Sequence, residues 1–212
     1  MLEYYLISFA FFFLSYIAKI NDPSNLKLLM VDLSTIHASV ITILSTFYIL
    51  YPIISYVQYI AFISPFSVGY CITDLFYLLF SAPKVDKEMV FHHSVFLIFM
   101  TPYFLEKYTE QIALASLSEL STVFLNTCYL MYNSREGTSS PYFREMTIAT
   151  LVSYFFTRCV NFTYISFFAF SNSYYDALSM CLPLTILNYI WFWRLVAKRA
   201  STLSQVKQKK VE

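Results

Sequence analysis

The sequence predicts an all-α membrane protein, and three observations support this prediction. Of its 212 residues, 58% are hydrophobic and 20% aromatic, whereas only 13% are charged, about half the charged fraction of an average soluble domain. The apolar residues gather into seven stretches, each near the 17 to 25 residues, roughly, that a helix needs to cross a bilayer. Runs such as YLISFAFFFLSYIA do not alternate apolar and polar residues, as the strands of a β-barrel do.

Short polar connections separate the predicted spans. The spans cover residues 2–18, 28–50, 59–82, 89–105, 111–133, 145–170 and 176–195. Because the connections leave no room for a domain outside the membrane, we expect one membrane domain over residues 28–199. An N-terminal helix with its loop precedes it over residues 1–27, and a basic tail follows over residues 200–212. The first span lacks the basic flank of a cleaved signal peptide, so we expect it to be retained.

Basic residues are distributed unequally about these spans. Twelve of the 14 Lys and Arg residues lie at one set of span ends and connections, Lys107 lies at the other, and Arg158 lies within a span. Because cytosolic loops carry an excess of Lys and Arg, we predict a cytosolic C-terminus and a lumenal N-terminus. The net charge of +1 gives no basic field that would favour nucleic acid as a partner.

The chain ends in KQKKVE, in which Lys209 and Lys210 resemble the dilysine signal that returns membrane proteins to the endoplasmic reticulum. A receptor reads such signals, so coat or retrieval machinery is a candidate partner. We therefore predict a multi-pass protein of the endoplasmic reticulum membrane. The alternative is an ordinary basic tail on the cytosolic side.

Ionisable side chains inside the spans are the candidate functional residues. They include Asp32, His37, Asp74, His92, His93, Glu119 and Arg158. Each costs about 2.5 to 3.5 kcal/mol to insert at the centre of a membrane helix, so such residues face the interior of the bundle and pair with one another.

Depth along the helices suggests which of these residues pair. At about 1.5 Å per residue, Glu119 and Arg158 both lie about 20 Å from the cytosolic boundary, which predicts a structural ion pair. A binding pair for a lipid head group is the functional alternative. His37 and Asp74 both lie about 12 to 14 Å deep. Their pairing is either a core hydrogen bond or a carboxylate that orients an imidazole for proton transfer.

The adjacent histidines of KEMVFHHS lie nearer the boundary, about 5 to 6 Å deep in a layer with Asp32. Their side chains differ in direction by about 100°, so His92 and His93 cannot both face one point, and we predict no metal site. Their placement fits either interfacial structure or chemistry. The four cysteines lie within spans without CxxC spacing, which predicts neither a disulfide framework nor a zinc site.

Several motifs together resemble a known family. They are STIHASV, VGYCITDLFYLL, KEMVFHHS, SELSTVFLN, FFTRCVN and LNYIWFWRLVAKR, between about residues 28 and 199. Their order and spacing resemble the TLC domain, found in translocating-chain-associated membrane proteins, longevity-assurance ceramide synthases and a ceroid-lipofuscinosis protein. The resemblance implies a barrel of six helices around a lipid-accessible cavity, here with one extra N-terminal helix.

The resemblance also implies roles for single residues. In the ceramide synthases of this family, the paired histidines are catalytic and transfer a fatty acyl group from coenzyme A to an amine. The match would carry that role to His92 and His93. It would place His37 and Asp74 as polar neighbours in the cavity. Together with Glu119 and Arg158, these are the candidate lipid-binding residues of the cavity.

The chain departs from the synthase pattern at two places. Synthases have threonine where this chain has Phe96, and they carry two acidic residues where LASLSELS has Glu119 alone. The chain therefore resembles the non-synthase members more, and we expect a protein that binds or regulates sphingolipids or phospholipids. One alternative is an N-acyltransferase that uses acyl-coenzyme A as a substrate and no other cofactor. A second is a trafficking or cargo receptor of the endoplasmic reticulum.

Overall fold

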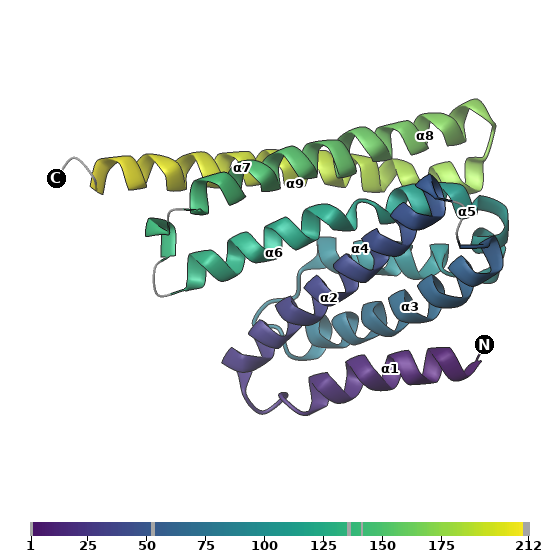
Figure 1. Cartoon of the computed structure of the whole chain (residues 1–212), viewed down its shortest axis with the longest axis horizontal. Coiled ribbons are helices and arrows are strands. Elements are labelled where there is room, and N and C mark those ends of the chain that lie inside the picture. The colour runs from purple at the N-terminus through teal and green to yellow at the C-terminus, as the bar shows by residue number, and fades with distance from the viewer. Residues whose placement is uncertain (1, 52–53, 135–136, 141, 210–212) are drawn as a thin grey trace. The chain divides into compact units, whose positions relative to one another are not determined.

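The computed structural model describes residues 2–51, 54–134, 137–140 and 142–209, and no side chain beyond Arg199 is described. Within these ranges every regular element is a helix, which confirms the predicted all-α class. The chain forms two compact units, Met1–Leu117 and Ser118–Glu212, whose helices are labelled in Figure 1. Lys210 of the predicted dilysine signal lies outside the described residues, and so does the side chain of Lys209.

Five helices make up the first unit. They are α1 (Leu2–Ile17), α2 (Pro23–Leu50), α3 (Tyr56–Phe80), α4 (Lys87–Phe99) and α5 (Pro102–Ser116). Local sequence explains where several of them begin. Ser55 and Gln58 form a capping box at the start of α3, in which each side chain satisfies a backbone N–H of the first turn. Asp86 caps α4 by accepting from two backbone N–H groups, as acidic residues do at helix starts.

The structure divides residues 87–133 differently from the prediction. Two spans were predicted there, over residues 89–105 and 111–133, but three helices are present: α4, α5 and the first helix of the second unit. Helix α4 ends before Thr101, whose backbone is extended (φ −73°, ψ 151°), because a residue that precedes proline avoids the helical region. Pro102 then begins α5 at the position where its missing N–H is tolerated. The polar residues of the predicted connection, such as Lys107, lie within α5.

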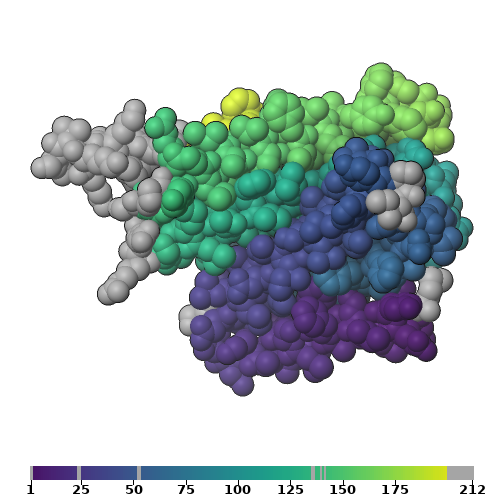
Figure 2. All heavy atoms as spheres, in the orientation of Figure 1, coloured from purple at the N-terminus to yellow at the C-terminus, as the bar shows by residue number. Residues whose placement is uncertain are grey.

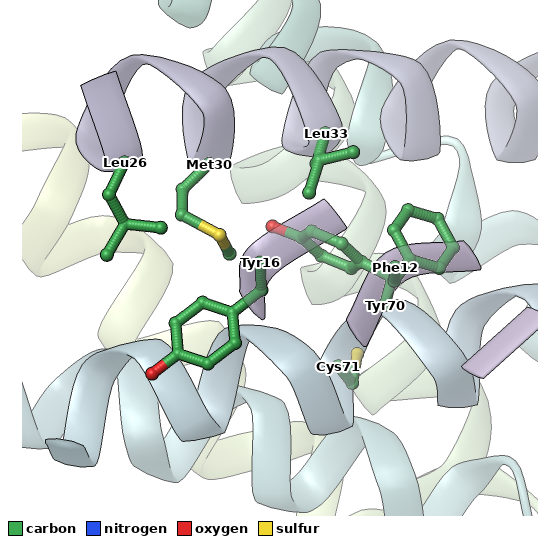
Figure 3. Packing of buried hydrophobic residues seen from close by; sticks show 7 residues of the cluster. All are labelled: Phe12, Tyr16, Leu26, Met30, Leu33, Tyr70 and Cys71. Atoms are coloured by element: carbon green, nitrogen blue, oxygen red, sulfur yellow. The ribbon is translucent and has the colours of Figure 1, made fainter. Parts of the chain in front are cut away.

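Helix α1 packs closely against α3 at Gly69. A Cβ atom at Gly69 would lie 2.5 Å from Ser8 Oγ and 2.8 Å from the Ser8 backbone carbon, so only glycine allows the two helices to approach this closely. Figure 3 shows the adjoining core, in which Phe12 and Tyr16 of α1 meet residues of α2 and α3. The predicted N-terminal helix is therefore part of the packed core of the first unit.

The described residues of the second unit form four α-helices, a short 3₁₀ helix and a π-helical turn. They are α6 (Glu119–Asn133), the short 3₁₀ helix η1 (Gly137–Ser139), α7 (Phe143–Tyr154), the π-helical turn η2 (Phe155–Val160), α8 (Asn161–Ser171) and α9 (Tyr175–Lys209). In Figure 1, α7 and α8 continue along one axis, and α9 runs beside them in the opposite direction. The predicted span over residues 145–170 corresponds to the continuous α7–η2–α8 segment.

The π-helical turn η2 aligns the buried faces of α7 and α8. At about 100° per residue, one uninterrupted α-helix would point these two sets of buried residues in directions about 80° apart. A π turn accommodates one extra residue in the helix, which brings the two faces nearly into line. The buried residues are Phe143, Thr147, Thr150 and Tyr154 in α7, and Phe162, Ile165, Ser166 and Ala169 in α8.

The described helices have the length and composition of a membrane protein. Three segments are long and apolar enough to cross a bilayer: Asn25–Leu50, Tyr56–Phe80 and Tyr175–Arg199. Large apolar side chains are exposed on both units, for example Leu6 on α1, Phe167 on α8 and Trp193 on α9. Figure 2 shows α1 in purple at the surface of the first unit. Hydrocarbon chains, rather than water, are the solvent that such a surface suits.

Candidate functional site

Helix α3 carries three buried polar side chains on one face. Ser67, Tyr70 and Asp74 follow one another at spacings of three and four residues, which places them on the same side of a helix. All three are buried. A hydroxyl, a phenol and a carboxylate therefore lie in a row on a largely apolar helix, where each buried polar group needs a partner.

The partner of the Asp74 carboxylate is the imidazole of His93 on α4. Asp74 Oδ2 lies 3.2 Å from His93 Nδ1, and both side chains are buried, with exposures of 7% and 5%. The contact has the length of an ion pair, but Nδ1 does not meet hydrogen-bond geometry in the part of the chain that the structure describes. A carboxylate this close to an imidazole can orient the ring if a small rotation completes the hydrogen bond. With that hydrogen bond formed, Nε2 would be the basic nitrogen, as in the His and Asp of a catalytic triad.

His37 of α2 lies beside Ser67 and Tyr70. Its Nε2 lies 3.3 Å from Ser67 Oγ, and its ring stacks on that of Tyr70, with centroids 4.2 Å apart and planes inclined by 17°. The Tyr70 ring also lies 5.8 Å from that of His93. Tyr70 therefore joins His37 to the carboxylate–imidazole pair, and three helices contribute to one buried group.

His92 completes this group, with its ring centroid 5.4 Å from that of His93. We name the group the histidine cluster. It consists of His37, Ser67, Tyr70, Asp74, His92 and His93. Both adjacent histidines are buried, although their directions along α4 differ. The cluster lies entirely within the first unit.

The contact of Asp74 with His93 differs from the depth-based expectation, which paired Asp74 with His37. Depth counted along the sequence placed Asp74 and His93 in separate layers, because it takes every helix as starting from one plane and ignores how each is turned about its axis. The same count put Asp32 beside the histidine pair. Asp32 is exposed on α2, whereas His92 and His93 are buried, so it is not part of the buried group.

Aromatic rings surround the histidine cluster. Phe12 of α1 packs edge-on against Tyr70, with centroids 5.7 Å apart, which connects the N-terminal helix to the cluster. Phe96 packs edge-on against His37 at 6.5 Å. Phe96 is the position at which the synthase pattern has threonine, so an apolar ring stands beside His37 where a hydroxyl was implied.

Glu119 and Arg158 form the predicted ion pair in the second unit. Arg158 Nη2 lies 3.6 Å from Glu119 Oε1, and both side chains are buried. The guanidinium also donates hydrogen bonds from Nε to Ser121 Oγ, at 2.8 Å, and from Nη2 to Thr122 Oγ1, at 2.7 Å. Its carbon Cζ lies 5.3 Å from the centre of the Tyr154 ring, a favourable site for a cation.

Two adjacent residues of the π-helical turn contact different helices. Arg158 reaches Ser121 and Thr122 on α6, while Cys159 Sγ lies 3.8 Å from the backbone oxygen of Asn188 on α9. Wide turns of this kind are frequent at functional sites. The Asn188 side chain is 1% exposed, and neither of its amide atoms has a hydrogen-bond partner in the part of the chain that the structure describes.

Sequence reasoning gave no role to the hydroxyl and aromatic members of these groups. The spacing of Ser67, Tyr70 and Asp74 places them on one helix face. This pattern is visible in the sequence and could have identified Ser67 and Tyr70 as neighbours of Asp74. Ser121 and Thr122 follow Glu119 closely, but their bonds to Arg158 depend on how α6 is turned about its axis. Asn188 lies in the motif LNYIWFWRLVAKR, which carried no assignment for it.

Among the described residues, no group of three or more His, Cys, Asp or Glu side chains could hold a metal ion. The four cysteines are buried and free. The histidine cluster of the first unit can supply a buried base, and the second unit by itself holds an ion pair with hydroxyl partners. Chemically, these groups suit the recognition of a polar head group or proton transfer.

Comparison with known proteins adds one finding. A model of the TLC domain matches residues 34–197. The match begins within α2, ends within α9 and includes both buried polar groups, whereas α1 lies outside it. Neither the curated proteins nor the solved structures contain a match to the chain.

Proposed function

The chain belongs to the TLC-domain family, and from this membership and the histidine cluster we propose that it binds a membrane lipid and so regulates the lipid composition of its membrane. Sphingolipids and phospholipids are the candidate ligands. The proposal rests chiefly on the buried contact of His93 with Asp74, which lies on a helix that is apolar enough to span a bilayer. Ionisable groups in such helices are costly, and they are a functional site by default.

The histidine cluster offers complementary groups for a polar head group. An imidazole can donate or accept at Nε2, and the Tyr70 phenol can do both. These groups lie in apolar surroundings, where hydrogen bonds to a ligand are stronger than in water. A lipid presents hydroxyl, amide or ester groups joined to apolar chains, so it suits a polar cluster within apolar helices.

Lipid bound to the purified protein tests the proposal. The full chain is extracted in mild detergent, and mass spectrometry identifies the lipids that remain bound. The variants His92→Ala and His93→Ala are compared with wild type in abundance, membrane insertion and bound lipid. We expect insertion to be unchanged and bound lipid to be lost. Bound lipid at the wild-type level in the double variant would overturn the proposal.

A second candidate function is acyl transfer, and the carboxylate on His93 Nδ1 favours it. In this reaction Nε2 takes the proton of a substrate amine, whose nitrogen attacks the carbonyl carbon of an acyl-coenzyme A thioester. The C–S bond breaks, an amide forms, and the departing thiolate receives the proton from Nε2. Asp74 would stabilise the imidazolium that forms between these two steps.

The position of Phe96 makes acyl transfer the less favoured candidate, because its ring packs on His37 where the synthase pattern has a hydroxyl. Incubation of the purified protein with labelled acyl-coenzyme A and either sphingoid bases or lysolipids tests the activity. Transfer that exceeds a His93→Ala control would support it. Transfer equal to that control would exclude it without affecting the test of lipid binding.

A further inference from the structure

Arg199 is a buried cation at the end of the last membrane-spanning segment. Its side chain is 7% exposed, and its Nε atom is buried without a hydrogen-bond partner in the described part of the chain. Within the same residues no carboxylate forms an ion pair with it. Arg158, the other buried arginine of this unit, has both an ion pair and two hydrogen bonds. A guanidinium nitrogen that is buried without a partner is costly, so a ligand that accepts a hydrogen bond from it would stabilise Arg199.

The guanidinium of Arg199 lies at the start of helix α7. Its Cζ atom lies 5.8 Å from the centre of the Phe143 ring, and Phe143 is buried as the first residue of α7. The first backbone N–H groups of a helix are positively polarised and attract anions. Glu145, in the same turn, is exposed. The contact with the Phe143 ring therefore brings the guanidinium to the first residue of α7.

The surroundings of Arg199 are those of a lipid head group. The segment Tyr175–Arg199 is long and apolar enough to cross a bilayer, which places Arg199 where hydrocarbon gives way to the head-group layer. Arg194 and Lys198 on α9 are exposed, and so is Arg144 next to Phe143. Basic side chains between helices at the membrane surface bind phosphate-bearing lipids.

We propose that Arg199 binds the phosphate group of an anionic membrane lipid, with the start of α7 as the second contact. The planar fork of arginine donates two parallel hydrogen bonds to phosphate oxygens, which lysine cannot reproduce. The acyl chains of the lipid would lie along the exposed apolar side of α9, next to Trp193. This site lies in the second unit, apart in sequence from the histidine cluster, and does not depend on the proposed function.

Native mass spectrometry of the full chain in detergent tests the site. The probes are dioleoyl phosphatidic acid, dioleoyl phosphatidylcholine with the same acyl chains, and inorganic phosphate. We expect wild type to retain one phosphatidic acid molecule in preference to phosphatidylcholine. Arg199→Gln should weaken this retention about tenfold, the value of a charge-assisted hydrogen bond. Arg199→Lys keeps the charge but not the fork, and should also weaken it.

Lys198→Gln is the matched control, because it removes one exposed charge from the adjacent position and should change retention less than about twofold. An equal loss in Lys198→Gln and Arg199→Gln would show a diffuse attraction and overturn the proposal. If equimolar inorganic phosphate displaced phosphatidic acid, the site would bind free phosphate, and the proposal that its ligand is a lipid would be wrong. If the Arg199 variants aggregate, the test uses the wild-type protein alone. Equal retention of phosphatidic acid and phosphatidylcholine by wild type would overturn the proposed site.

Discussion

Asp74 brings a carboxylate beside the imidazole of His93, and its replacement by asparagine isolates the effect of that charge. Asparagine has nearly the same shape but presents no negative charge to His93 Nδ1, 3.2 Å away. The ring then loses a charge-assisted partner and its fixed orientation. We expect bound lipid to fall about tenfold, measured by mass spectrometry of the purified protein. Asp32→Asn, at an exposed carboxylate of α2, is the control, and a similar loss there would contradict the assignment.

Arg158 and Glu119 stabilise the second unit through their mutual contact. Removal of one partner leaves the other charge buried and unpaired, so Arg158→Leu should lower the free energy of unfolding by about 3 to 5 kcal/mol. The double variant Glu119→Leu with Arg158→Leu leaves no unpaired charge and should recover part of this loss. Thermal unfolding in detergent measures both. A double variant no more stable than Arg158→Leu would show that the hydroxyl contacts, rather than the ion pair, carry the stability.

The prediction for single residues was confirmed where depth along the helix was enough to identify the partner. Glu119 and Arg158 lie at equal depth on consecutive predicted spans, and opposite charges at one depth attract, so their pairing followed from the sequence. The partner of Asp74 did not follow from the sequence, because the depth count placed His37 at its level and His93 in another layer. The start and the rotation of each helix decide which imidazole Asp74 contacts. That rotation depends on packing of the whole unit, such as the stacking of His37 on Tyr70.

At the scale of elements, the approach of α1 to α3 depends on Gly69. Gly69→Ala would place a methyl group 2.8 Å from the Ser8 backbone carbon and 2.9 Å from the Phe9 nitrogen. Backbone atoms cannot relieve such a clash by a change of rotamer, so the two helices would have to move apart. We expect a loss of about 1 to 3 kcal/mol, seen as a lower unfolding temperature and as protease cleavage after α1. Val57→Leu, at an exposed site on the same helix, should have no effect.

The Ser8→Gly background sharpens the Gly69→Ala test. If only the Ser8 hydroxyl obstructed the new methyl group, Ser8→Gly would restore stability. The contacts with the backbone of α1 predict that it does not. Full recovery in the double variant would mean that the two backbones are farther apart than the structure places them.

Helix boundaries were predictable where the sequence carries a specific signal. Thr101–Pro102 ends one helix and begins the next, because proline restricts the residue before it, although the apolar pattern alone had joined them. The break at Leu117–Ser118 carries no such signal, since residues 112–118 read IALASLS, without glycine or proline. Composition therefore favoured one continuous span there, and tertiary packing overrode it.

At the scale of the whole molecule, orientation in the membrane remains a prediction from charge. A tag at the C-terminus should be accessible in cells whose plasma membrane alone is permeabilised, while a tag before Leu2 should be protected. The reason is the excess of Lys and Arg on one side of the spans. Protection of both tags, or access to both, would contradict the prediction and imply an even number of crossings.

The all-α membrane class was predictable because it depends on bulk properties. Apolar composition and span length do not change when a helix begins two residues earlier or turns about its axis. The division into two compact units was not predictable, because its boundary falls within an apolar run. Buried polar residues such as Asp74 and Arg158 marked both candidate sites, since charge within apolar sequence is visible without a structure.

The π-helical turn implies that the chain is one residue longer between Phe155 and Val160 than the packing of α7 and α8 requires. A deletion inside a helix normally rotates everything beyond it and turns a buried face outward. Here the loss of Phe156, which is exposed, should convert the wide turn into ordinary α-helix and leave both flanking faces in place. We expect this shortened protein to insert and accumulate, as followed by membrane abundance, whereas deletion of Ile148 in α7 should abolish accumulation. The chain would thus tolerate the deletion of a residue within this turn, because the turn already contains one residue more than an α-helix needs.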